Sequence, residues 1–569
     1  MQSRRNGVNM LMDGVQKITS RRLGVIGWST FLWLVAPIPQ GTEFRGSIVD
    51  ADSGKPIAAR VYLRNAAGEW LFVKSTATNG SALPYLEQWI PMAGSVERHT
   101  TVSAHPFRIE LPRGEYTLEI ESGKEFIPLR RRLEIADAPV EHTFRLKRWI
   151  SLAEHGWFSG ETHVHRRISE LPNVMLAEDL NVAFPVTFWT IRSDVAPDLQ
   201  PSRLRSHGPS PFGPREDRGV DPIRIDPTHV ILPRNTEYEI FRVGDRGHTL
   251  GALFLLNHRS VFTKLAPPVA PIAEQAHAEG ALIDLDKHSW PWSMMLVPVA
   301  KVDLFELSNN SVWRTQFGFN QAPPLAPPWT NLEKDGPKTL TEWGWLNYGF
   351  EVYYALLNCG FKLMPTAGTA SGVHPVPLGY SRVYVHTGKN FGVDEWLRGL
   401  KAGRSFVTTG PILFATVNGK LPGETFSFRR PPGDGIAVDI ESISEQPIAQ
   451  IEILVNGELV ESVVPDLMKT PAGAWRAKVS RRLTIKETSW LAVRSIEPQP
   501  DGRKRFAHTA PWHFVVNSQP NVPRRVQVQY FISLMEQEIQ RNREILPPAA
   551  LAEFEVALQA YQSLLLRAR

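Results

Sequence analysis

The chain has 569 residues, of which 42% are hydrophobic and 21% charged, and this composition excludes an intrinsically disordered protein. At about 150 residues per domain, the length predicts three or four domains. Most of the formal net charge of +5 lies in residues 1–22, which carry a local charge of +4, so the charge excludes a nucleic-acid-binding surface. The single cysteine, Cys359, excludes an intrachain disulfide framework.

Residues 1–40 have the form of an export signal. Arg21 and Arg22 precede the uncharged run of residues 23–38, and a basic stretch before a short apolar segment is typical of a secretory signal. This run is shorter than the ~20 residues of a membrane-spanning helix. We therefore expect a signal peptide or an N-terminal anchor, a periplasmic or extracellular location, and no membrane span beyond that anchor.

Residues 41–150 are expected to form a β-sandwich. Short, partly alternating segments such as ARVYLR and EYTLEIES are separated by the turn signals DSGKP and PRG, a pattern typical of all-β sandwiches. The stretch GSIVDADSGKPIAARVYL resembles the transthyretin-like regulatory sandwich of carboxypeptidases. This resemblance implies a domain that does no chemistry of its own.

The remaining chain divides into three further regions. In residues 151–412, apolar runs such as LGALFLLNH alternate with helical stretches such as APIAEQAHAEG, which predicts βα units in a barrel-like parallel sheet. Residues 413–520 return to short strands with VNG hairpin signals and predict a second β-sandwich. Residues 521–569 carry two amphipathic stripes and predict a helical hairpin with a structural role. The expected fold class is therefore multidomain α/β plus β.

The segment GWFSGETHVHR, residues 156–166, carries the first candidate site. Residues two apart on a strand share a face, so His163 and His165 present two imidazoles together. In a parallel barrel the active site lies at the carboxyl ends of the strands. Imidazole nitrogen is a ligand for divalent transition metals such as Zn, Mn and Fe.

Four further residues lie near the ends of predicted strands and are candidate ligands, namely Glu237, His248, His288 and His374. A series of this kind is what a metal site at a barrel mouth requires. Tryptophans are dense between residues 290 and 345. Trp290 and Trp292 are candidates for stacking on a sugar or an aromatic ligand near the mouth, as an alternative to packing in the core.

WFSGETHVHR, with NTEYE, VDLFELSNN and GTASGVH after it, resembles the PHP superfamily of metal-dependent hydrolases, specifically the branch named for carbaryl and carbofuran hydrolases (CehA/McbA-type). The resemblance spans roughly residues 150–420. It implies a distorted (β/α) barrel with one to three metals at the strand ends. It assigns His163 and His165 as metal ligands and Glu237 as a bridging carboxylate. His288 would be a further ligand, His248 a ligand or a neighbour of one, and His374 an additional candidate.

Two motifs depart from the family pattern. Thr187-Phe188-Trp189 stands where the family commonly has Thr-Asp-His, and the segment GTASGVH lacks the aspartate of Gly-Ser-Asp-x-His, with Ala370 and Ser371 in that region. Clustered cations need bridging anions to offset their repulsion. The remaining residues therefore predict one or two ions instead of three.

The sequence thus predicts an exported hydrolase that cleaves a phosphoester or a carboxyl or carbamoyl ester of a small-molecule or glycan-type substrate. A metal held by His163, His165 and Glu237 would activate a water, and His248 or His288 would bind metal or transfer a proton. The alternative is a catalytically degenerate relative that binds a glycan or a partner. The sequence does not predict an oligomeric state.

Overall fold

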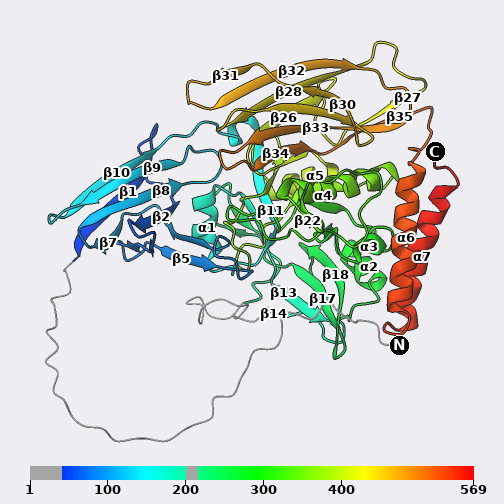
Figure 1. Ribbon diagram of the computed structural model, residues 1–569, viewed down its shortest axis with the longest axis horizontal. Coiled ribbons are helices and arrows are strands. Elements are labelled where there is room, and N and C mark those ends of the chain that lie inside the picture. Colours follow the sequence, from blue (N-terminus) through cyan, green and yellow to red (C-terminus); the bar gives the residue numbers. More distant parts are fainter. Residues whose placement is uncertain (1–40, 200–215) are drawn as a thin grey trace, which may run out of the picture. The chain divides into compact units, whose positions relative to one another are not determined.

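The computed structural model describes residues 41–199 and 216–569 (Figure 1). The predicted signal or anchor in residues 1–40 lies outside the described residues. The protein is a mixed α/β structure with 39% strand and 18% helix, so strands exceed the 20–25% usual for globular proteins. No helix among the described residues is long and apolar enough to cross a membrane.

The first region consists of two sheets that bury one core between them. The first sheet, in the order β10-β1-β7-β4, contains β1 (Thr42–Asp50), β4 (Lys74–Ser75), β7 (Phe107–Leu111) and β10 (Val140–Leu146). The second sheet, in the order β5-β6-β2-β8-β9 with β3 on β2, contains β2 (Ala59–Asn65), β3 (Trp70–Leu71), β5 (Ala82–Glu87), β6 (Glu97–Val102), β8 (Gly114–Glu121) and β9 (Leu129–Ile135). Successive side chains of a strand point to opposite faces of the sheet, and this decides which of them enter the core. In β8, for example, Tyr116, Leu118 and Ile120 are buried.

The middle region divides its strands between two sheets. A seven-stranded sheet, in the order β14-β13-β17-β18-β19-β20-β23, contains β13 (Phe188–Arg192), β14 (Asp198–Leu199), β17 (Thr236–Val243), β18 (Arg246–Leu256), β19 (Leu282–Leu285), β20 (Leu304–Ser308) and β23 (Met364–Ala367). A twelve-stranded sheet begins with β11 (Trp157–Val164), β12 (Val182–Pro185), β15 (Ile223–Arg224), β16 (Val230–Ile231), β24 (Arg382–His386) and β25 (Ser405–Thr408).

The middle sheets are mixed, whereas the sequence predicted parallel ones. The pairs β11–β12, β13–β17, β19–β20 and β20–β23 are parallel, but β17–β18, β18–β19 and β11–β24 are antiparallel. For β17 and β18 the physical reason is their tight connection, because a short turn can join only antiparallel strands. Among the described residues these ladders do not close into a barrel.

Backbone hydrogen bonds nevertheless join the ends of the two middle sheets. The N–H of Ala370 donates to the carbonyl of His163 (2.8 Å), and the N–H of His165 donates to the carbonyl of Ser371 (2.9 Å). On the other side of β11, the N–H of Val186 donates to the carbonyl of Val164 (2.7 Å). The end of β11 is therefore held between the segment after β23 and the segment that leads from β12 into β13.

The last strands complete the twelve-stranded sheet and add a facing sheet. The former gains β27 (Thr425–Phe428), β29 (Gln450–Val455), β30 (Glu458–Val463), β33 (Ser489–Pro498), β34 (Lys504–Thr509) and β35 (Trp512–Val516). The facing sheet contains β26 (Ile412–Val417), β28 (Ile436–Ser444), β31 (Leu467–Lys469) and β32 (Trp475–Leu483), and a small ladder joins β21 (Lys334–Gly336) to β22 (Thr339–Leu340). Because β25 pairs with β34, strand pairing continues across the boundary predicted at residue 412.

Seven α-helices lie in the described residues: α1 (Leu171–Glu178), α2 (Ala270–Ala278), α3 (Ser293–Val299), α4 (Glu342–Asn358), α5 (Val393–Ala402), α6 (Arg525–Asn542) and α7 (Pro548–Leu565), with a 3-10 turn at Ala153–His155. Figure 1 shows α6 and α7 side by side at the C-terminal end of the chain. The ring of Phe531 stacks on that of Tyr561 at 5.0 Å, and the hydroxyl of Tyr561 donates to the carbonyl of Met294 in α3 (2.7 Å).

Glu553 ties α7 to the start of α2. Its carboxylate accepts the N–H groups of Val269 (2.8 Å) and Ala270 (2.7 Å), two of the donors that a helix N-terminus leaves without partners. We expect Glu553→Ala to lower the free energy of unfolding by about 2 kcal/mol, because hydrogen bonds to a buried charged group are lost. Chemical denaturation measures this change. Glu555→Ala, an exposed position of the same helix, is the matched control, and an equal effect of both substitutions would contradict this role.

Candidate metal centre

Strand β11 brings the two predicted histidines to one place. His163 lies within β11 and His165 directly follows it, and both side chains are buried. The two Nε2 atoms are 3.1 Å apart, as expected for residues two apart on one strand face. The prediction drawn from the His-x-His spacing therefore agrees with this geometry.

Glu237 of β17 joins these histidines in the first of two groups of ligand atoms. Its Oε2 lies 3.5 Å from Nε2 of His165, and one ligand atom from each of His163, His165 and Glu237 lies within 4.8 Å of the others. Two imidazoles and one carboxylate are a common ligand set for a catalytic divalent metal. These three residues can hold one ion.

A second group shares His163 with the first. Its Nδ1 lies 3.2 Å from Oε1 of Glu306 in β20 and 3.8 Å from Oδ2 of Asp286, which follows β19, and these three residues also offer ligand atoms within 4.8 Å of one another. The imidazole of His163 therefore has Nε2 toward one group and Nδ1 toward the other. Carboxylates commonly take this position next to a metal-binding histidine, where they fix its tautomer.

The carboxylates of both groups are buried without sufficient partners. Both oxygens of Glu237, Oδ1 of Asp286 and Oε1 of Glu306 have no hydrogen-bond partner among the described residues. Burial and the like charge of Glu239 raise the pKa of Glu237 well above its usual range. Burial and the charges of Asp284 and Asp286 do the same to the pKa of Glu306. A divalent cation fits here, because buried carboxylates need a counter-charge.

Lys287 already supplies one cation to this cluster. Its Nζ pairs with Asp286 and lies 3.4 Å from Oε1 of Glu239 and 3.6 Å from Oε1 of Glu237. Burial opposes the charge of Lys287, but the three carboxylates outweigh burial and hold the pKa of its ammonium well above the usual range. This ammonium uses carboxylate oxygens that a second metal ion would need.

Gly368 allows the segment after β23 to approach the centre. A Cβ at this position would lie 2.3 Å from Cβ of His163 and 2.4 Å from Oε1 of Glu306. The next residue, Thr369, is held by the buried carboxyl of Glu161, which accepts its N–H (2.7 Å). Burial raises the pKa of Glu161 to about 8, so this carboxyl carries a proton for much of the time at neutral pH.

His288 and His374 lie near the centre but belong to neither group. His288 stacks on Phe305 at 5.7 Å, and burial lowers its pKa to about 4, so it is uncharged at neutral pH. His374 stacks on Trp89 at 4.4 Å, and its carbonyl accepts the hydroxyl of Tyr85 (2.7 Å). The first sandwich therefore contacts the loop beside the centre, although the sequence assigned that domain no role in chemistry.

The structure does not bring His248 to the centre. Its Nε2 lies 2.7 Å from Oδ1 of Asn542 in α6. The strand register explains the difference, because Glu237 pairs with Phe254 and His248 lies six residues, or about 20 Å, further along β18. His248 lies near the start of β18, whereas the ligand atom of Glu237 lies beside the other end of that strand.

The two predicted substrate-stacking tryptophans have different surroundings. Trp292 is 0% exposed within the core, which leaves no surface of it for a substrate. Trp290 is partly exposed and packs against Phe241 at 5.3 Å, and its ring centroid lies 5.6 Å from Nζ of Lys287. Of these two tryptophans, Trp290 is the one that lies beside Lys287.

Aromatic residues occupy two positions of the segment Thr187-Phe188-Trp189. Phe188 is buried in β13, and the ring of Trp189 meets that of His165 edge-on at 5.6 Å, so neither residue offers a ligand atom to the centre. Ser371 accepts a hydrogen bond from Nε of Arg166 (3.2 Å) and reaches no ligand group.

Sequence reasoning missed Asp286, Lys287 and Glu306. The runs LIDLD and LFELS place carboxylates within otherwise apolar strands, and a charged residue in a buried strand needs a partner. The sequence therefore carries a signal for both carboxylates, whereas His288 in the same segment as Asp286 belongs to neither group of ligand atoms.

We expect Gly368→Ala to weaken metal binding, because the added methyl group displaces His163 and Glu306. Such overpacking also lowers the free energy of unfolding by about 1–3 kcal/mol. Calorimetric titration of the metal-free protein with Zn²⁺ or Mn²⁺ measures the loss of affinity. Gly433→Ala, where an added Cβ meets nothing within 4 Å, is the control. Unchanged metal affinity in Gly368→Ala would show that the close packing of Gly368 against His163 and Glu306 does not affect metal binding.

Comparisons with known proteins name no relative for this centre. No family model matches the chain, and neither a curated protein nor a solved structure matches it. The resemblance to the PHP superfamily therefore depends on the sequence motifs, and the argument for a metal site depends on the geometry of His163, His165, Glu237 and their neighbours.

Proposed function

We propose that the protein is an exported, metal-dependent hydrolase of the PHP type that cleaves a phosphoester or a carboxyl or carbamoyl ester of a small-molecule or glycan-type substrate. The observation that carries the proposal is the buried group of His163, His165 and Glu237, whose ligand atoms lie within 4.8 Å of one another. Export is proposed from the sequence of residues 1–40.

The strand connections support a distorted barrel for this centre. The backbone bonds from Ala370 to His163 and from His165 to Ser371 connect the two sheets at the edge where the ligands gather. His163, Glu237 and Glu306 come from β11, β17 and β20, so several strands contribute to one cluster, as in barrel enzymes.

We assign one ion to His163 Nε2, His165 and Glu237. Glu306 then accepts from Nδ1 of His163 and orients its ring, a role that carboxylates commonly take beside metal-binding histidines. A bound divalent ion lowers the pKa of a water ligand and polarises the scissile group. Lys287 takes the place of a second ion, since its ammonium already pairs with Asp286 and lies beside Glu237.

The substrate would approach from the side of His165, Lys287 and Glu239. Their exposed fractions are 6%, 7% and 8%, whereas Glu237 is 0% exposed. The ammonium of Lys287 lies there and can bind a developing negative charge on the substrate oxygen, as a fixed cation in a partly dry site does.

A non-catalytic binding module is the second candidate. Phe188 and Ser371 stand where acidic ligands are common in the family, and the partly exposed ring of Phe319 lies 5.7 Å from that of His374. Aromatic side chains of this kind pack against sugar and aromatic ligands. Metal binding without hydrolysis of any ester class would favour this candidate.

We expect the double substitution His163→Ala and His165→Ala to reduce bound metal to background, because two of three ligands are lost. Metal analysis by plasma mass spectrometry measures this, and hydrolysis of p-nitrophenyl esters and of bis-p-nitrophenyl phosphate should fall in parallel. His248→Ala is the control, because this histidine contacts α6 instead of the centre. Full metal retention in the double variant would remove the basis of the proposal.

We expect Lys287→Met to raise the metal content from one ion to two per chain. Removal of the ammonium frees the oxygens of Asp286 and Glu237 for a second ion, and the carboxylates then need that charge. Titration of the metal-free protein gives the stoichiometry. Lys301→Met, at an exposed lysine, is the control. A content of one ion in Lys287→Met would mean that something other than the ammonium limits the site.

A further inference from the structure

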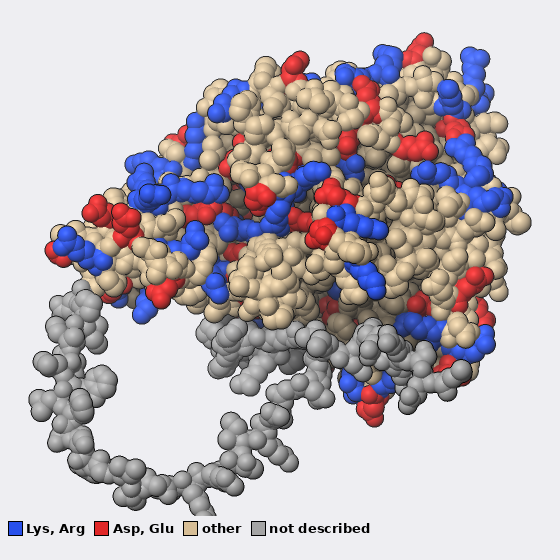
Figure 2. All heavy atoms as spheres, in the orientation of Figure 1, with Lys and Arg blue, Asp and Glu red and all other residues tan. Residues whose placement is uncertain are grey.

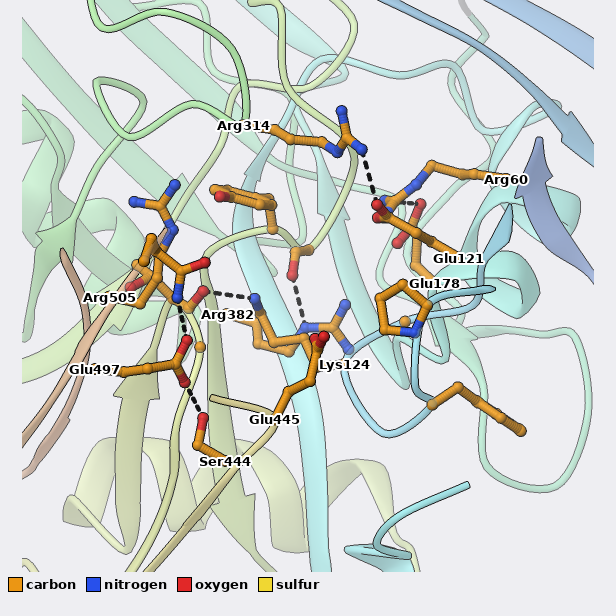
Figure 3. A pocket seen from close by; sticks show the side chains of 18 of the residues that line it. Arg60, Glu121, Lys124, Glu178, Arg314, Arg382, Ser444, Glu445, Glu497 and Arg505 are labelled. Atoms are coloured by element: carbon orange, nitrogen blue, oxygen red, sulfur yellow. Dashed lines mark hydrogen bonds and ion pairs between the residues drawn. The ribbon is translucent and has the colours of Figure 1, made fainter. Parts of the chain in front are cut away.

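A second polar cavity lies away from the metal centre. It has a volume of about 280 Å³, and Figure 3 shows the charged side chains that line it. The first sandwich contributes Arg60 and Lys124, the middle region contributes Tyr380 and Arg382, and the last strands contribute Glu497 and Arg505. On the face seen in Figure 2, basic and acidic side chains are interspersed, without one large surface of a single sign.

One side of the cavity is neutralised by its own ion pairs. Arg60 pairs with Glu178 at 2.5 Å and also with Glu121, and Arg314 pairs with Glu121 at 2.9 Å. In Figure 3 these side chains lie together on the side opposite Glu497 and Ser444. These cations have carboxylate partners and are not available for a ligand.

Two other cations of the cavity, Lys124 and Arg382, have no such partners among the described residues. Nζ of Lys124 donates to the carbonyl of Thr409 (2.8 Å), and Nε of Arg382 donates to the carbonyl of Gly379 (2.6 Å). Within residues 41–199 and 216–569, neither Lys124 nor Arg382 forms an ion pair with a carboxylate. Burial, together with the positive charges of Arg382 and Arg505, lowers the pKa of Lys124 well below its usual range.

Tyr380 lies between two of these cations. Its ring centroid is 4.9 Å from Nζ of Lys124 and 5.3 Å from Cζ of Arg505. The ion pair of Arg505 is made with Glu342, at 3.6 Å, and Glu342 does not line the cavity. Two cations, Lys124 and Arg505, thus lie over one aromatic ring, and Arg382 lines the same cavity.

The nearest acidic group offsets this charge only weakly. The carboxyl of Glu497 is hydrogen-bonded to Ser444 and Gln499. Burial raises the pKa of Glu497 to about 8, so this carboxyl is largely protonated at neutral pH. Protonation of Glu497 removes a negative charge from the cavity, whereas the lowered pKa of Lys124 reduces its positive charge until an anion binds beside it.

We propose that this cavity binds a small oxyanion, a phosphate or a carboxylate, through Lys124, Arg382 and Arg505. Oxyanions accept several hydrogen bonds at once, and guanidinium groups match them with two parallel donors. The volume is near the lower limit of ligand pockets in proteins, which suits a small metabolite. Because all three regions contribute lining residues, a bound anion would hold these regions together and stabilise the folded chain.

Thermal unfolding of the full chain tests this proposal with inorganic phosphate and with glucuronate, each compared with chloride at equal ionic strength. We expect at least one of the two oxyanions to raise Tm saturably, and the two separate salts distinguish phosphate from carboxylate. Lys124→Met should abolish the rise. Lys147→Met is the matched control, because Nζ of Lys147 also donates to one carbonyl, that of Pro471 (3.1 Å), but does not line the cavity.

Glu497→Gln provides a second variant that keeps the shape of the side chain. It removes the negative charge that Glu497 gains above its pKa of about 8, so oxyanion affinity measured by calorimetry above pH 8 should increase. No rise of Tm above that in chloride would overturn the proposal. An equal rise in wild type and Lys124→Met, or weaker binding in Glu497→Gln, would also overturn it. None of these outcomes depends on the metal centre.

Discussion

The burial of carboxylates next to imidazoles is the constraint on which the centre of this protein depends. Glu237 and Glu306 are each 0% exposed, and burial shifts the pKa of both carboxyls well above the usual range. Buried groups of one sign are costly unless a counter-charge is present. Lys287 supplies part of that charge, and a divalent ion at His163 and His165 would supply the rest. The joined strand ends hold these groups in place.

The same principle distinguishes the two polar sites of the chain. At the candidate metal centre carboxylates outnumber cationic side chains, so the counter-charge that is still needed is a cation. In the cavity beside Lys124 and Arg382 the cations exceed the ionised carboxyls, so the missing partner is an anion. In each case the proposed ligand is the charge that the chain leaves uncompensated. The metal centre is built on strand ends of the middle region, whereas the cavity is lined by all three regions.

Much of the strand content and part of the centre could be predicted from sequence. Alternation identified segments such as ARVYLR, which lies in β2, and the spacing of His163 and His165 placed two imidazoles on one face. Spacing could not give the register of β18, so His248 was assigned to a site about 20 Å away along the strand. It also could not show that β17 and β18 are antiparallel. Glu306 lies within the apolar strand β20 and Asp286 directly follows β19, so both charges stand out in the sequence, but spacing could not show that they lie beside His163 of β11.

X-ray absorption at the metal edge tests the central claim most directly, because it reports the ligands themselves. For protein purified without chelators, we predict one divalent ion per chain. Its first shell should contain two imidazole nitrogens at about 2.0–2.1 Å and carboxylate or water oxygens at about 2.0–2.2 Å. The imidazole signal should disappear in the double variant of His163 and His165. A metal-free protein, or a bound ion whose first shell contains no imidazole nitrogen, would contradict a metal centre formed by His163, His165 and Glu237.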